Sequence, residues 1–256
     1  MQKVTKAIII LTLGYILLMI YAYGVFLQIP VVQGQTLTLQ AVVEPFVYIV
    51  LMTIGNLFVF KAVYSQEKSK KQFFDEKKLL PWVITLLMLV AFGVGIHSSA
   101  QLIEGTFINS STATIHFIDN FSSQLSYFLE EYPGHYLIAI PAIILSFFLA
   151  KIELNRKKAK SKRFEKGIIS FCALFVGVIS AVSNAEGHST LFMLPISFYL
   201  LILLFRGNRQ KGRNLLTMPF SSYFTISVIS MILINIIFGL TFGWFVQPTE
   251  LGFGSI

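Results

Sequence analysis

Histidines and carboxylates are the side chains of this chain best suited to catalysis or metal binding. Most of them lie outside the four segments that contain all the Lys and Arg residues. All four histidines lie outside those segments: His97, His116, His135 and His188. Seven carboxylates do so as well: Glu44, Glu104, Asp119, Glu130, Glu131, Glu186 and Glu250. Imidazole and carboxylate groups are ligands of zinc, iron, manganese and copper. These residue types therefore predict a site for a divalent transition metal, with zinc as the first expectation.

Helical spacing aligns several of these groups in the segment 116–131. Positions three, four and seven apart share a face of a helix, so His116, Asp119, Tyr127 and Glu130 fall on one side, opposite a face rich in Phe and Leu. Helices that lie on a membrane surface usually have Lys and Arg on the polar face, and this one has neither. We expect an amphipathic helix that covers a polar site.

The other candidate residues lie near the ends of apolar segments. His97 and Glu104 share one face at the end of "FGVGIHSSAQLIEG". His135 follows the Pro-Gly pair of "YPGH", which we expect to form a turn before the next helix. Glu186 and His188 stand in "SNAEGHST", a predicted connection between two helices. An ionisable group within an apolar helix is functional by default, which makes His97 the strongest single candidate.

The composition predicts an all-α integral membrane protein. Hydrophobic residues make up 55% and charged residues 12% of the 256 residues, and the mean hydropathy is +0.74. In soluble proteins about a quarter of the residues are charged. The single cysteine, Cys172, excludes a disulfide within the chain and any CxxC motif.

Seven segments are long and apolar enough to cross a bilayer, whose hydrocarbon core needs about 20 helical residues. They are 7–29, 44–64, 80–104, 134–151, 168–185, 189–205 and 219–245. The first is too long for the apolar region of a signal peptide, so we expect it to be a retained helix.

The basic residues predict the orientation of these helices. All 20 Lys and Arg residues lie in four segments, 3–6, 61–78, 151–166 and 206–213. Because Lys and Arg mark the cytoplasmic ends of membrane helices, an even number of crossings should separate successive basic segments. The N-terminus is then cytoplasmic, the C-terminus is outside, and the helix 116–131 lies on the outer side without spanning.

The net charge of +8 follows from this arrangement and does not predict nucleic-acid binding. All the basic residues belong to the inner side, whereas the seven carboxylates named above and the four histidines belong to the outer side. The expected surroundings are the lipid bilayer, most simply the plasma membrane, with the site facing the exterior or a lumen. The sequence does not specify an oligomeric state.

Two short segments resemble a known family. An intramembrane histidine in "GVGIH" followed by the acidic helix "HFIDN", in a seven-helix chain, is similar to the CREST superfamily of membrane metal hydrolases, which includes alkaline ceramidases and adiponectin-receptor-like proteins. The resemblance implies a zinc site in which His97 matches the histidine of a Ser-xxx-His element and Asp119 the aspartate. Gly93 stands where the family has serine, and the last helix lacks His-xxx-His, so His135 and His188 would have to supply the other ligands.

These observations favour a divalent-metal-dependent hydrolase that acts on a lipid-like substrate. The expected metal ligands are His97, His116, His135 and His188, and the expected catalytic residues are Asp119, Glu186 and Glu104. A zinc ion would lower the pKa of its bound water to about 7. Two alternatives stay open, a cation or proton-coupled transporter and a non-enzymatic assembly subunit. The scattered polar residues at the middle of the helices favour a one-sided site over a conduit.

Overall fold

The computed structural model describes residues 1–23, 39–66, 76–103, 120–156, 161–210, 215–244, 246–247 and 251. Most of these residues are helical, and the described part of the chain contains no strand. The elements are α1 (Lys3–Tyr23), α2 (Leu39–Tyr64), α3 (Glu76–Ile103), α4 (Asn120–Leu129), η2 (Glu130–Gly134), α5 (His135–Glu153), α6 (Arg163–Glu186), α7 (Thr190–Gln210), η3 (Leu215–Thr217) and α8 (Pro219–Phe242).

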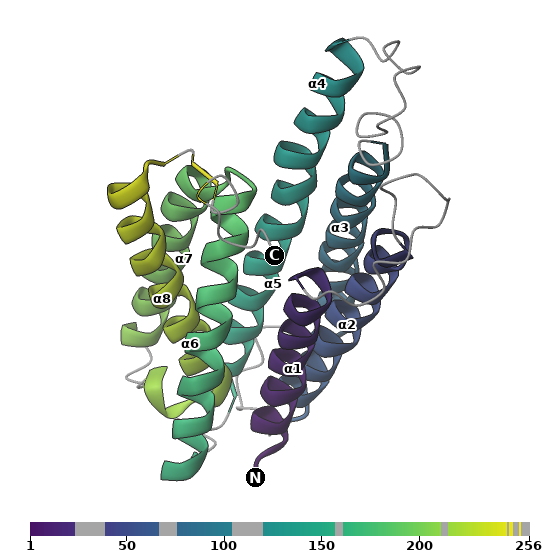
Figure 1. Ribbon diagram of the computed structural model, residues 1–256. Helices are drawn as coiled ribbons and strands as arrows, with labels where there is room; N and C mark the ends of the chain where they lie inside the picture. Colours follow the sequence, from purple (N-terminus) through teal and green to yellow (C-terminus); the bar gives the residue numbers. More distant parts are fainter. Residues whose placement is uncertain are drawn as a thin grey trace.

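Among the described residues, seven helical segments are long and apolar enough to span a membrane, which confirms the predicted all-α class and the predicted number of apolar helices of spanning length. Successive spans alternate in direction, and the described lysines and arginines lie at the end of the bundle where α1 begins (Figure 1). The assignment of that end to the cytoplasm stays a prediction.

A buried carboxylate joins three helices at this basic end. Glu153, at the end of α5, is 0% exposed. Its carboxylate accepts hydrogen bonds from the backbone N–H groups of Phe220 at 3.1 Å and Ser221 at 2.7 Å, and from the Ser221 hydroxyl at 2.9 Å. It also accepts one from the side chain of Gln66, just after α2, at 3.5 Å. The first N–H groups of a helix have no partner within the helix, so Glu153 caps α8.

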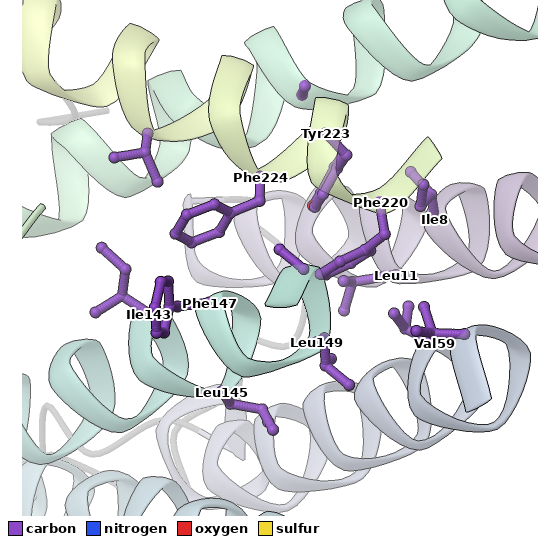
Figure 2. Packing of buried hydrophobic residues seen from close by; sticks show 14 of the residues in the cluster. Ile8, Leu11, Val59, Ile143, Leu145, Phe147, Leu149, Phe220, Tyr223 and Phe224 are labelled. Carbon is purple, nitrogen blue, oxygen red and sulfur yellow. The ribbon is translucent and has the colours of Figure 1, made fainter. Parts of the chain in front are cut away.

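Aromatic and branched side chains fill the centre of the bundle. Phe147 of α5 packs against Phe224 of α8, with ring centroids 6.3 Å apart, and Phe220 lies one turn earlier on α8 (Figure 2). Other large apolar side chains point outward: Met88 is 66% exposed and Leu240 is 74% exposed. Such an apolar exterior suits contact with acyl chains.

The connection between α4 and α5 differs from the prediction. We expected an outer helix over 116–131, a turn at Pro133 and a span from 134, but α4 continues through the π-helical turn η2 into α5. The backbone around this proline stays in the right-handed helical region, with φ of −58° at Gly134 and −64° at His135. A proline inside an α-helix removes a hydrogen bond and its ring clashes with a carbonyl. The wider π-turn relieves this conflict without ending the helix.

The continuous helix from α4 to α5 is about 50 Å long at 1.5 Å per residue. It exceeds the thickness of the hydrocarbon core, about 30 Å. The α4 end rises beyond the other helices, at the end of the bundle away from the N-terminus (Figure 1). Near its base, the Ser126 hydroxyl donates to the Ala100 carbonyl of α3 at 2.9 Å. Helix α4 therefore continues the line of α5 rather than forming a separate helix beside it (Figure 1).

Candidate functional site

Three of the predicted histidines gather at the end of the bundle opposite the basic residues. His97 comes from α3, His135 begins α5, and His188 lies in the connection between α6 and α7. The rings of His97 and His135 meet edge to face, with centroids 4.7 Å apart and an angle of 68° between their planes. The ring of His135 lies against Gly187, the residue next to His188.

Glycines make this approach possible. A Cβ atom built on Gly187 would lie 2.2 Å from Cγ of His135, and one on Gly134 would lie 2.9 Å from Cβ of His97. Real Cβ atoms essentially never approach another heavy atom this closely. The absence of a side chain at each position therefore allows an imidazole ring to pack against the neighbouring backbone.

His188 is held by two tyrosines from the long helix. Its Nε2 atom lies 3.1 Å from the Tyr127 hydroxyl, a hydrogen-bond distance. Its ring stacks on Tyr132, with centroids 6.1 Å apart and a 19° interplanar angle. With φ of 45°, His188 is the one non-glycine residue of the described ranges with positive φ. Such a conformation persists where surrounding contacts determine it, and these two tyrosines supply such contacts.

The carboxylate of Glu130 approaches the ring of His97. Its Oε1 atom lies 3.9 Å from Nδ1 of His97, within ion-pair range but too far for a hydrogen bond. Glu130 and its neighbour Glu131 are each 9% exposed, because η2 turns both of them toward the bundle. Our candidate catalytic residues did not include Glu130 or Tyr127. The helical spacing that aligned both with His116 is the signal that could have found them.

Glu186 ends α6 beside this cluster. Its backbone carbonyl accepts a hydrogen bond from the side chain of Gln247 at 2.6 Å, which ties the residues after α8 to the site. The following turn is braced by Ser189, whose backbone N–H donates to the Asn184 carbonyl at 2.9 Å. The structure therefore places Glu186 on the same side of the bundle as the histidines, as predicted.

Three of the predicted site residues, Glu104, His116 and Asp119, lie outside the described residues. Among the residues that the structure describes, no group of three or more His, Cys, Asp and Glu side chains could hold a metal ion. The described part of the chain does not by itself build the predicted zinc site. A metal bound between His97 and His135 would need further ligands from outside it.

A cavity of about 250 Å³ leads from the histidines into the bundle. His97, His135 and Glu186 line one end, and every spanning segment contributes to the wall. Polar side chains also line its deeper part, among them Tyr15, Ser146, Tyr223 and Ser227. Ser146 lies about 16 Å along α5 from His135, at 1.5 Å per residue.

Most of the remaining wall is apolar, including Met52, Phe224 and Val228. Of all the lining residues, Glu186 is the single Asp, Glu, Lys or Arg. A volume of about 250 Å³ lies just below the range of about 300–1,000 Å³ that is typical of ligand sites. The cavity can therefore enclose a small molecule or one end of a longer one.

Comparison with protein families, with curated proteins and with solved structures finds no match to this chain. The similarity to the CREST superfamily stays a prediction that rests on "GVGIH" and "HFIDN".

Proposed function

We propose that the protein is a multi-pass membrane protein that binds a lipid-like molecule in its central cavity. The molecule's polar group would lie at the end formed by His97, His135 and Glu186, and its apolar part would extend toward Phe224. The observation that carries the proposal is the cavity itself, which joins a His/carboxylate end to a largely apolar interior. Ligand sites are commonly of this kind, mostly apolar with a few convergent polar groups.

The proposed activity is hydrolysis at the His/carboxylate end, which we place on the outer side of the plasma membrane. His97, held near Glu130, and His135 both line the cavity. An imidazole in this position can take a proton from a water molecule that attacks a bound ester or amide. Dependence on a divalent metal, the expectation from the sequence, is a separate part of this proposal.

Elemental analysis tests the metal. We would purify the protein in detergent and measure zinc, iron, manganese and copper in the wild type, in His97→Ala and in His135→Ala. Gln124→Ala, at an exposed position of α4, is the matched control. We expect close to one metal ion per chain in the wild type and the control, and a loss in both histidine variants. A metal-free wild type would refute metal dependence. Hydrolysis would then be tested by itself, by measuring whether the protein releases fatty acid or amine from a lipid substrate.

One observation favours a second candidate function, transport. Polar side chains line the cavity along its depth, from His97 at one end to Ser146 and Tyr223 far from it. A path for ions across the membrane needs polar groups within the membrane. The sequence alone did not show that His97, Ser146 and Tyr223 line one cavity. At the basic end, the hydrogen bonds of Glu153 to α8 close the bundle.

Flux through proteoliposomes separates transport from hydrolysis. Replacing Ser146 by Phe would fill the deep part of the cavity. If the protein is a transporter, this variant loses flux of the transported cation or proton. If it is a hydrolase, the wild type shows no flux, and Ser146→Phe still hydrolyses a short-chain substrate whose apolar part does not reach the filled region.

A further inference from the structure

The charge of the cavity's lining selects among lipid-like molecules. Glu186 is the one residue with a formal charge at neutral pH among those that line it. The segments that form the spans between the basic loops, residues 79–150 and 167–205, contain no Lys or Arg at all. A bound anionic group would therefore meet a carboxylate and find no fixed cation to pair with.

The polar end of the cavity also offers hydrogen-bond acceptors, among them a carboxylate and two imidazole rings. A carboxylate such as that of Glu186 accepts hydrogen bonds, and a neutral imidazole has one donating and one accepting nitrogen. The Nδ1 atom of His97 is buried and lies 3.9 Å from Oε1 of Glu130, beyond hydrogen-bond distance. Buried polar atoms normally have a partner, so this nitrogen is suited to receive an N–H group from a ligand.

We propose that the ligand of the cavity is a single-chain amphiphile whose polar group is a protonated amine. The ammonium would lie beside Glu186 and His97, and the chain would occupy the space between α1, α5, α6 and α8. An alkylammonium carries up to three N–H donors and a positive charge, as the lysine side chain does, which matches both features of this end. This inference rests on the proposed binding function and names the chemical class of its ligand.

The limited volume favours a single chain over a two-chain lipid. About 250 Å³ lies below the range of about 300–1,000 Å³ typical of sites for drug-sized ligands. A chain of about eight carbons is therefore a suitable probe.

Binding of three matched probes tests the proposal. The purified wild-type protein, in discs of phosphatidylcholine, would be titrated with octylamine, octanol and octanoate, and binding followed by the rise in its unfolding temperature. We expect octylamine to bind at least tenfold more tightly than octanol, and octanoate to bind most weakly. In Glu186→Gln the preference for the amine over the alcohol should fall below threefold. The affinity for octanol should not change, which also shows that the variant is folded.

Two further variants separate uptake into the cavity from partition into the bilayer. Ala142→Phe fills the cavity wall and should abolish binding of all three probes, whereas Leu240→Phe, on the exposed face of α8, should change none. Equal binding of amine, alcohol and carboxylate, or an amine preference that survives in Glu186→Gln, would overturn the amine proposal and leave the cavity as a lipid site. Absence of binding by every probe, or binding that ignores Ala142→Phe, would overturn the proposed binding function itself.

Discussion

Gly177 of α6 lies so close to α8 that adding one methyl group should separate the two helices. A Cβ atom there would lie 2.6 Å from the carbonyl oxygen of Ser227, 2.7 Å from Cβ of Ser230 and 3.3 Å from the backbone nitrogen of Met231. These atoms belong to the backbone of α8 or lie next to it, so no flexible side chain can move aside. Small residues allow membrane helices to approach in this way, where van der Waals packing supplies much of the attraction.

The magnitude follows from two opposing effects. Alanine favours a helix over glycine by about 0.5–1 kcal/mol. Overpacking costs about 1–3 kcal/mol. If the added methyl group pushes the helices apart by about 0.5–1 Å, each van der Waals contact between them loses a quarter to a half of its energy. Gly167, in the same helix, has nothing within 4 Å of a Cβ position. Gly167→Ala is therefore the matched control, and it gains the helix propensity without the clash.

The difference between the two variants isolates the cost of the clash. We expect Gly177→Ala to be less stable than Gly167→Ala by about 1–3 kcal/mol, measured as the free energy of unfolding in mixed detergent micelles. The wild type should lie between them or close to Gly167→Ala. If Gly177→Ala proves as stable as Gly167→Ala, α6 and α8 do not approach as described, and the cavity wall that they form would have to be revised.

Three other perturbations test the site, the basic end and the orientation. Gly187→Ala should displace the ring of His135, which lies 2.2 Å from the new Cβ position; octylamine affinity should fall at least tenfold while the protein still folds, and unchanged affinity would show that His135 does not contribute to binding. Glu153→Ala should lower the free energy of unfolding by about 1–3 kcal/mol for each N–H group of α8 left unpaired. Glu153→Gln keeps one acceptor oxygen and should lower it less, and an equal loss of stability in both variants would contradict a capping role. In intact cells, a membrane-impermeant maleimide should label Gln124→Cys and spare Lys162→Cys, since these exposed positions lie at opposite ends of the bundle; the reverse pattern would invert the proposed topology.

The number of apolar helices of spanning length, and the end of the bundle at which His97, His135, His188 and Glu186 lie, were readable from the sequence. Span number depends on apolar length, a local property, and the basic residues of the inner segments mark one end of every span. The even number of crossings expected between successive basic segments placed His97, His135 and His188 together at the other end. The turn predicted from the Pro-Gly pair at Pro133 was wrong, because a π-turn keeps the helix continuous there.

Which side chains meet within that end was decided by the tertiary structure alone. Helices α3 and α8 are apolar on nearly every side, since one face packs on protein and the other suits lipid, so their sequences do not reveal which face points inward. The contact of His97 with His135 depends on how α3 and α5 are rotated about their axes, and that rotation is set by close approaches such as Gly93 against the backbone of Leu137. The cavity is a space between seven spans and has no counterpart in any one segment.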